Sequence, residues 1–164
     1  VIPFNTYGPR EHFEGAYGEV IPKFVLRALN DQPPVIFGDG LQTRDFTYVA
    51  DTVKGIIAAS ESDGMIGQTV NIARGEEVSI KELAEKIYKK LGKPHIKPVF
   101  EKERPGDVKR HFAEVEKAEK LFGFRAEIGI DKGLDMFISW FTSQGYDMAD
   151  LMKEDIVFNW ETPK

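Results

Sequence analysis

Two arginines stand in loops that glycine and proline shape. Arg44 follows the turn Gly38-Asp39-Gly40 and leads into a predicted strand, and Arg104 stands in the segment Glu103-Arg104-Pro105-Gly106-Asp107. A planar guanidinium offers forked N–H donors that match phosphate oxygens, so two such loops would suit a diphosphate. An Arg–Asp neighbour pair is more often a solvated ion pair or a turn stabiliser, and spacing alone favours that structural role.

Two further residues have suitable chemistry for a ligand, each with an ordinary structural alternative. Phe37 precedes the Gly-Asp-Gly turn, and its ring is expected in the core while its backbone can hydrogen-bond a ligand at the strand end. Asn5 ends an apolar strand and offers one acceptor and two donors, which would orient a polyhydroxyl ligand. The alternative for Asn5 is a turn-forming Asx residue.

Motifs for several other kinds of chemistry are absent from the sequence. No glycine-rich dinucleotide loop, no phosphate-binding Gly-x-x-x-x-Gly-Lys-Ser/Thr and no Gly-x-Ser-x-Gly occurs. His12, His95 and His111 are scattered without metal-ligand spacing, and there is no cysteine. The sequence therefore predicts no metal site, no thiolate nucleophile and no disulfide.

Composition limits the partners and the compartment. The 164 residues carry a net charge of −5 and a pI near 5.3, which argues against broad binding of nucleic acid or of an anionic membrane. No apolar run approaches the roughly 18–20 residues that span a bilayer, and no signal segment is visible. A cytoplasmic protein is expected.

The first residues suggest that the chain is a fragment. It begins without methionine on Val1-Ile2-Pro3-Phe4, an apolar segment typical of the end of a buried strand. A missing N-terminal part is therefore expected, and a recombinant domain with a cleaved leader is the alternative.

Apolar spacing predicts helices that alternate with short strands. Predicted helices cover residues 20–29, 51–59, 80–91, 115–122 and 131–143. Predicted strands cover residues 1–4, 35–37, 46–49 and 68–73, with an extended segment at 95–100. Asp51 and Asp131 are expected N-caps, and the helix after Asp51 is expected to be buried through Val53, Ile56, Ile57 and Ala59. The alternation predicts the α/β class, with too few strands for a complete doubly wound sheet.

Taken together, these segments resemble the extended short-chain dehydrogenase/reductase family, specifically its nucleotide-sugar epimerases and dehydratases. The matching stretches, in the family's order, are Pro3-Phe4-Asn5-Thr6-Tyr7-Gly8-Pro9-Arg10, Ile21-Pro22-Lys23-Phe24, Val35-Ile36-Phe37-Gly38-Asp39-Gly40, Gln42-Thr43-Arg44-Asp45-Phe46-Thr47-Tyr48-Val49 with Asp51, Val70-Asn71-Ile72, Arg104-Pro105-Gly106-Asp107-Val108-Lys109-Arg110, Glu116-Lys117-Ala118 and Leu121-Phe122-Gly123-Phe124. No single stretch is decisive, but the ordered set is specific.

The resemblance implies that residues 1–145 are the C-terminal, substrate-binding portion of such an enzyme, followed by a tail at 146–164. This portion combines a substrate-binding lobe with the terminal strands and helices of a Rossmann-type NAD-binding fold. The family's glycine-rich loop and its catalytic Tyr-x-x-x-Lys would lie upstream, and no tyrosine here has a lysine four residues later. No catalytic residue is therefore assigned, NAD is expected to be bound mainly by the missing part, and the chain alone is expected to be inactive. Homodimers are typical of the family.

The resemblance also implies roles for individual residues. Pro3 is similar to the position near the nicotinamide of NAD, and the nucleotide-sugar contacts fall on Asn5, Glu19, Val20, Val35, Phe37, Arg44, Arg104 and Asp107. Among these, Val35 and Phe37 resemble the strand whose backbone holds the base, and Arg44 and Arg104 resemble the two arginines on the diphosphate. Many relatives carry arginine before the Pro-Phe-Asn segment, where this chain has Ile2.

The activity implied for the parent enzyme is NAD-dependent 4-epimerisation of a nucleoside-diphosphate sugar. The C4 hydroxyl is oxidised, the keto-sugar rotates, and the hydride returns to the opposite face. Two alternatives remain: a 4,6-dehydratase, or a non-catalytic domain that binds sugar nucleotides.

Overall fold

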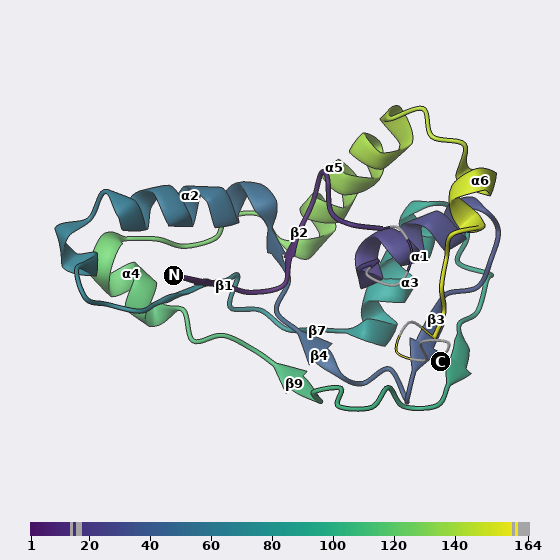
Figure 1. Ribbon diagram of the computed structural model, residues 1–164, viewed down its shortest axis with the longest axis horizontal. Coiled ribbons are helices and arrows are strands. Elements are labelled where there is room, and N and C mark those ends of the chain that lie inside the picture. Colours follow the sequence, from purple (N-terminus) through teal and green to yellow (C-terminus); the bar gives the residue numbers. More distant parts are fainter. Residues whose placement is uncertain (14, 16–17, 159, 161–164) are drawn as a thin grey trace. The chain divides into compact units, whose positions relative to one another are not determined.

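The computed structural model describes residues 1–13, 15, 18–158 and 160, and the chain divides into two compact units. Unit 1 comprises Val1–Pro9, Gln42–Ser79 and Val108–Phe137. Unit 2 comprises Arg10–Leu41, Ile80–Asp107 and Ile138–Lys164. Each unit combines parallel strand pairs with helices, as Figure 1 shows, which confirms the predicted α/β class.

Unit 1 is built on short strand pairs. Its strands are β1 (Ile2–Pro3), β2 (Thr6–Tyr7), β4 (Thr43–Arg44), β5 (Thr47–Tyr48), β6 (Asn71–Ile72), β7 (Val78–Ser79) and β9 (Arg110–His111). β1 pairs with β6 and β2 with β5, both in parallel. β4 lies between antiparallel β7 and parallel β9. Arg44 therefore stands on the central strand of a three-stranded sheet.

The helical elements of unit 1 pack small residues against these strands. They are α2 (Val49–Ser60), the 3₁₀ turn η1 (Asp63–Met65), α4 (Glu116–Phe122) and the first part of α5 (Ile130–Ser143). Gly55 lets α2 approach the core closely, because a Cβ there would lie 2.8 Å from Ile72 and 2.9 Å from Phe124. Ile72 and Phe124 belong to the buried cluster of this unit, together with Val70, Ala118 and Ala126.

Unit 2 places one parallel strand pair beside packed helices. Its elements are α1 (Val20–Leu29), β3 (Val35–Phe37), α3 (Ile80–Lys90), β8 (Val99–Glu101), the second part of α5 and α6 (Met148–Met152). α1 contacts both α3 and α6. Ile21 and Val25 on α1, and Leu83 and Ile87 on α3, are four residues apart and fully buried, so each helix presents one apolar stripe to the core.

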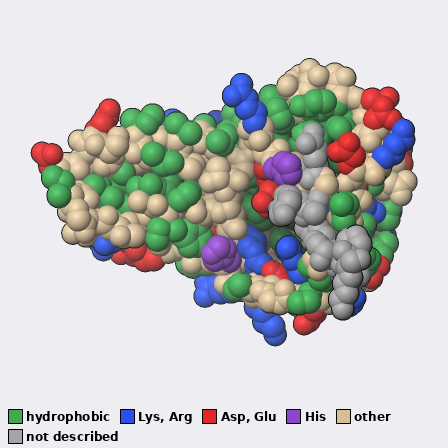
Figure 2. Space-filling model, viewed as in Figure 1, with side chains coloured by type: hydrophobic (Ala, Val, Ile, Leu, Met, Phe, Trp, Pro, Cys, Tyr) green, Lys and Arg blue, Asp and Glu red, His purple; other side chains and the backbone are tan. Residues whose placement is uncertain are grey.

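The predicted burial of the helix 51–59 is right for Ala59 and wrong for its three larger apolar residues. Val53, Ile56 and Ile57 are exposed, with Ile57 at 51%, and Figure 2 shows hydrophobic side chains on the surface over α2. The buried face consists of Asp51, Thr52, Gly55 and Ala59 instead. Small side chains bring the helix closer to β6 than the larger apolar ones would, and the larger ones lie on the solvent side.

Three details of the predicted element ends are also wrong. Asp51 is not the N-cap of α2, because the helix begins at Val49 and its cap is Tyr48. Asp131 is not the N-cap of α5, since that helix begins at Ile130. The strand at the start of the chain is exposed rather than buried, with Ile2 at 47%, because within the part of the chain that the structure describes β1 pairs only with β6.

Among the described residues, no helix is long and apolar enough to cross a membrane. The same residues contain no cluster of three or more histidine, aspartate or glutamate side chains that could hold a metal ion.

Candidate functional site

The candidate site residues fall into two groups, one in each unit. Unit 1 carries Pro3, Asn5 and Arg44, and unit 2 carries Glu19, Val20, Val35, Phe37, Arg104 and Asp107. The two groups are described separately.

Arg44 is positioned by the sheet of unit 1 and by the loop before β9. Its backbone is held between β7 and β9, where its Cα partners are Val78 and His111. Its guanidinium Nη1 donates to Thr43 O at 2.7 Å and to Val108 O at 2.6 Å. Val108 directly follows Asp107 in the chain.

Asp45, the neighbour of Arg44, organises the loops around it. Its side chain is fully buried and accepts hydrogen bonds from the backbone N–H groups of Arg74 at 3.2 Å, Gly75 at 3.0 Å and Ala113 at 3.4 Å. Burial raises the pKa of the Asp45 carboxyl above its ordinary value, although these donors act in the opposite direction. A buried carboxylate therefore fixes the segment that carries Arg44.

Asn5 is joined to the same segment. Its backbone has a positive φ of 27°, and its Nδ2 donates to Asp45 O at 3.0 Å. His111 lies next to it, with Nδ1 at 3.5 Å from Asn5 Nδ2 and its ring centroid 4.7 Å from that of Phe4. The turn role that the sequence offers for Asn5 is thus present, and in unit 1 Asn5 is hydrogen-bonded to Asp45, the residue that follows Arg44.

A surface ion pair supports the sheet below Arg44. Arg110 on β9 makes a bidentate contact with Glu77, Nε to Oε1 and Oε2 at 2.9 Å and Nη2 to Oε2 at 2.6 Å. Thr43 Oγ1 donates to the same carboxylate at 2.6 Å. The hydrogen bonds from Arg110 and then Thr43 hold the pKa of Glu77 below its ordinary value.

In unit 2, the register of β3 decides which backbone groups face a ligand. β3 runs parallel to β8, with Val99 N donating to Pro34 O at 2.9 Å and Gly38 N donating to Glu101 O at 2.9 Å. Alternate residues of a parallel strand bond to the same neighbour, so the main-chain groups of Val35 and Phe37 point to the opposite edge. The predicted contact of these backbone groups with a base stays a prediction.

Arg104 and Phe37 meet at one aromatic ring of unit 2. The guanidinium carbon of Arg104 lies 5.5 Å from the ring centroid of Trp160, and the ring of Phe37 lies 4.6 Å from that same indole. The guanidinium is therefore within about 10 Å of the Phe37 ring, although the two residues are far apart in the sequence. Asp107 closes the Arg104 turn, its N–H donating to Arg104 O at 3.2 Å.

Glu19 and Val20 form the start of α1. Glu19 is the N-cap residue, it is exposed, and its carbonyl accepts from Lys23 N at 3.2 Å without a side-chain cap. The positive charge of Arg104 contributes to lowering the pKa of Lys23, one turn into α1, although burial is the largest cause. The predicted role of Glu19 and Val20 at a diphosphate stays a prediction.

A cavity of about 330 Å³ lies elsewhere in unit 2. Arg10, His12, Trp140 and Tyr146 are among the residues that line it, and none of the predicted site residues does.

The predicted roles of Asn5, Arg44, Phe37 and Arg104 stay predictions, and the sequence motifs gave no sign of two other residues, Asp45 and Trp160. Asp45 stands inside a quoted motif, and an acid beside an arginine was interpreted as a surface pair. Trp160 carries no sequence signal, because its contact with Phe37 and Arg104 is made only by the folded tail. Whether Arg44 and Arg104 converge on one diphosphate stays a prediction.

Comparisons with known proteins connect these features to a family. Residues 1–137 match the model of a family described as GDP-mannose 4,6 dehydratase. The chain is 37% identical over 144 residues to a UDP-N-acetyl-alpha-D-glucosaminuronate decarboxylase of Bacillus cytotoxicus, a match that covers 84% of this chain and 44% of that protein.

Solved structures give the same result. An epimerase of Methanothermobacter thermautotrophicus is 34% identical, with a TM-score of 0.84 over 90% of this chain and 44% of that one. A UDP-glucuronic acid 4-epimerase of Bacillus cereus, solved with UDP-glucuronic acid and NAD, is 32% identical, with a TM-score of 0.78 over 86% of this chain and 44% of that one. The chain thus spans less than half the length of these relatives.

The family expected from the ordered motifs is confirmed, together with the Rossmann-type origin of the strands and helices. This chain belongs to the NAD-dependent nucleotide-sugar epimerases and dehydratases of the extended short-chain dehydrogenase/reductase family.

Proposed function

We propose that this chain is the nucleotide-sugar-binding part of an NAD-dependent 4-epimerase acting on nucleoside-diphosphate sugars. The observation that carries the proposal is the meeting of Phe37 and Arg104 at one indole of unit 2. A strand edge that could hold a base and a guanidinium that could hold a phosphate therefore lie beside the same indole.

The second arginine completes the proposed grip on the diphosphate. Arg44 is the second arginine that the family resemblance assigns to the diphosphate, and within unit 1 its guanidinium donates to the carbonyl of Val108. Charge-assisted contacts from two arginines would hold the non-reacting end of the substrate. Binding energy from that end leaves the sugar free to rotate between oxidation and re-reduction.

The residues of this chain do not by themselves fit NAD. The one position with a predicted NAD contact, Pro3, is an exposed residue of β1 without an N–H donor, and the 164 residues contain no glycine-rich pyrophosphate loop. We therefore derive no hydride step from this chain. We expect weak or no NAD binding and no turnover by the chain alone, with the chemistry supplied in the parent enzyme by the part that holds NAD.

The reaction itself has two rivals with specific support. The matching family model is described as a 4,6 dehydratase, and the Bacillus cytotoxicus relative is a decarboxylase. Each of these would use the same nucleotide-binding end. A non-catalytic sugar-nucleotide-binding domain is the third possibility, and a parent that turns over UDP-glucose or UDP-glucuronic acid would exclude it.

Calorimetric titration tests the proposal directly. Titration of this chain with UDP-, dTDP- and GDP-sugars should show saturable binding of at least one of these three classes of nucleotide sugar. The Arg44→Ala and Arg104→Ala variants should each weaken that binding about tenfold, which is the loss of one charge-assisted phosphate contact. Arg125→Ala is the matched control, because Arg125 is exposed and paired with Glu119.

Two results would contradict the proposal. Unchanged affinity in both arginine variants would return Arg44 and Arg104 to structural roles. Tight NAD binding by the 164 residues would show that the cofactor site is not where we place it.

A further inference from the structure

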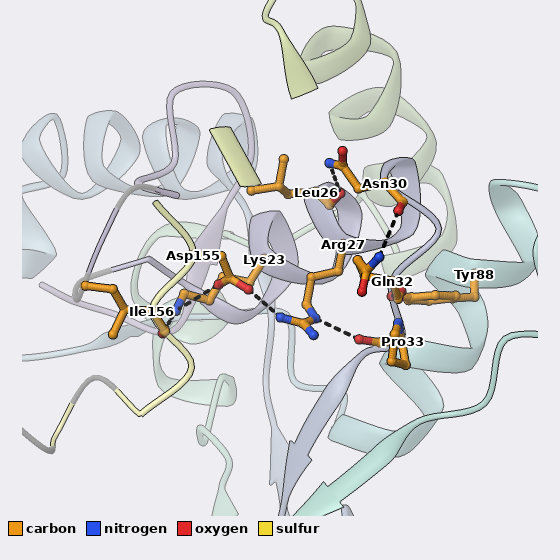
Figure 3. A network of polar contacts seen from close by, with 9 residues as sticks. All are labelled: Lys23, Leu26, Arg27, Asn30, Gln32, Pro33, Tyr88, Asp155 and Ile156. Atoms are coloured by element: carbon orange, nitrogen blue, oxygen red, sulfur yellow. Dashed lines mark hydrogen bonds and ion pairs between the residues drawn. The ribbon is translucent and has the colours of Figure 1, made fainter. Parts of the chain in front are cut away.

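The C-terminal tail lies beyond the residues that the family model covers, and a buried ion-pair cluster holds it to unit 2. The side chain of Asp155 is only 2% exposed and pairs with Lys23, 3.5 Å away, and with Arg27 (Figure 3). Lys23 Nζ also donates to Ile156 O at 2.6 Å, and Arg27 Nε donates to Pro33 O at 2.7 Å. Both cations lie on α1, so the tail is fixed to that helix.

A second attachment lies earlier in the tail. Asp147 caps α6 by accepting from Ala149 N and Asp150 N, and Asn30 Nδ2, at the end of α1, donates to Met148 O at 2.9 Å. The two attachments span α1 from Lys23 to Asn30. Both attachments therefore hold the tail against α1.

Beyond Asp155, two aromatic rings of the tail lie close to Phe37 on β3. Phe158 lies 5.9 Å and Trp160 4.6 Å from the ring of Phe37, and the planes of Phe37 and Trp160 meet at 79°. Two rings at nearly a right angle form a corner in which a flat heterocycle can pack against the face of one and the edge of the other. Trp160 itself is half-buried.

Two cations flank the same rings. Lys102 Nζ lies 5.6 Å from the ring centroid of Phe158, and the guanidinium of Arg104 lies 5.5 Å from that of Trp160. Aromatic faces bind bases by stacking, and guanidinium groups bind phosphates. Aromatic rings with cations lying over them therefore offer groups for both the base and the phosphates of a nucleoside diphosphate.

We propose that Trp160 is a nucleotide-binding residue, whose indole stacks on the base of a nucleoside diphosphate while Arg104 binds its phosphates. This inference rests on the proposed function and adds to it a residue of the tail, which lies outside the family match. The tail thereby becomes part of the substrate site.

Fluorescence isolates Trp160, because the chain contains only two tryptophans, Trp140 and Trp160. In the Trp140→Phe variant, titration with UDP should change the emission of Trp160 with the same midpoint as calorimetry. Trp160→Leu should weaken UDP binding about tenfold, as loss of one base–aromatic stack does, and Trp160→Tyr should restore affinity to within about threefold of wild type. Inorganic pyrophosphate has no base, so its affinities for Trp160→Leu and for wild type should agree within about twofold. Arg104→Ala should weaken the binding of both UDP and pyrophosphate.

Several outcomes would overturn the inference. Unchanged UDP binding in Trp160→Leu would show that Trp160 does not contribute to binding. Tighter UDP binding would show that the tail covers the site. An equal loss for UDP and pyrophosphate would mean that Trp160 acts through Arg104 and not on the base. A response of Trp140 alone, in Trp160→Tyr, would place the nucleotide at the cavity that Trp140 lines.

These failures differ from a failure of the proposed function. If wild type binds no nucleotide at all, both the proposed function and the inference are wrong. If wild type binds UDP and only the Trp160 results disagree, the proposed function stands and the inference falls. Thermal unfolding of each variant excludes loss of folding as the cause, and the emission of Trp160 in Trp140→Phe needs no change at Trp160 itself.

Discussion

Replacing Asp155 with alanine should destabilise unit 2 far more than an ordinary change in a C-terminal tail. The substitution leaves Lys23 and Arg27 without their carboxylate, at side chains that are only 16% and 12% exposed. Removing one partner of a buried ion pair costs about 3–5 kcal/mol. Because Lys23 keeps the Ile156 carbonyl and Arg27 keeps the Pro33 carbonyl, we expect the lower end, about 3 kcal/mol.

That free energy can be lost in two ways, and the assay separates them. If the tail stays docked, urea unfolding should show the full loss, and the melting temperature should fall by about 6–12 °C for a chain of this size. If the tail detaches, global stability falls less, but hydrogen exchange of residues 147–158 rises sharply. Equilibrium unfolding and hydrogen-exchange mass spectrometry on the same samples measure both effects.

The matched control is Asp150→Ala, in the same tail. Asp150 pairs with Lys153 at 2.6 Å, but both side chains are exposed, at 67% and 76%. An exposed pair of this kind contributes about 0.2–1 kcal/mol. If Asp155→Ala and Asp150→Ala lose the same stability and show the same exchange, the buried cluster does not hold the tail.

Two other predictions concern unit 1. The hydrogen bonds from Arg110 and Thr43 hold the pKa of Glu77 below 4.5, so the folded state binds a proton at this carboxylate more weakly than the unfolded state does. The stabilisation that ionised Glu77 contributes to the folded state is therefore present above pH 4.5, and it is lost as the pH falls through the lowered pKa. The difference in thermal stability between wild type and Glu77→Gln should therefore be largest near neutral pH and should shrink towards about pH 3, and a constant difference would contradict the role of the Arg110 pair. Gly133→Ala places a Cβ on the hydroxyl of buried Tyr7, so urea unfolding should show a loss of about 1–3 kcal/mol despite better helix propensity. Gly129→Ala, where a Cβ meets nothing within 4 Å, should be neutral, and equal effects of the two would show that Tyr7 moves freely.

The elements that the sequence predicted well are those whose apolar side chains face the core at regular spacing. α1 spans Val20–Leu29 as predicted, and α3 spans Ile80–Lys90, one residue short of the prediction, because each has one apolar stripe and a clear stop. α2 has such a stripe too, at Val53, Ile56 and Ile57, yet it buries the other face. Periodicity identifies an amphipathic helix, but only the fit of Gly55 against Ile72 and Phe124 decides which face packs.

The tail could not be predicted, for a related reason. α6 has five residues, too few for a period to emerge. Asp155 looks like one more acidic residue of an acidic chain, and its burial depends on Lys23 and Arg27, more than a hundred residues away. Motifs located Arg44 and Arg104 because local turn chemistry marks them, whereas Trp160 is brought to β3 by tertiary contacts alone.

The comparisons also bear on which part of the reaction this chain serves. The same stretch matches a family model described as a dehydratase, and it also matches a decarboxylase and two epimerases. The reactions of these enzymes differ. A segment shared by enzymes with different reactions is expected to carry what those reactions have in common, which is a nucleoside diphosphate joined to a sugar. The described residues fit that expectation, since they offer arginines, a strand edge and an aromatic corner, and the chain has no Tyr-x-x-x-Lys. We therefore propose that this chain binds the nucleoside diphosphate through β3, Arg104 and Trp160, and that the rest of the parent enzyme sets the identity of the reaction.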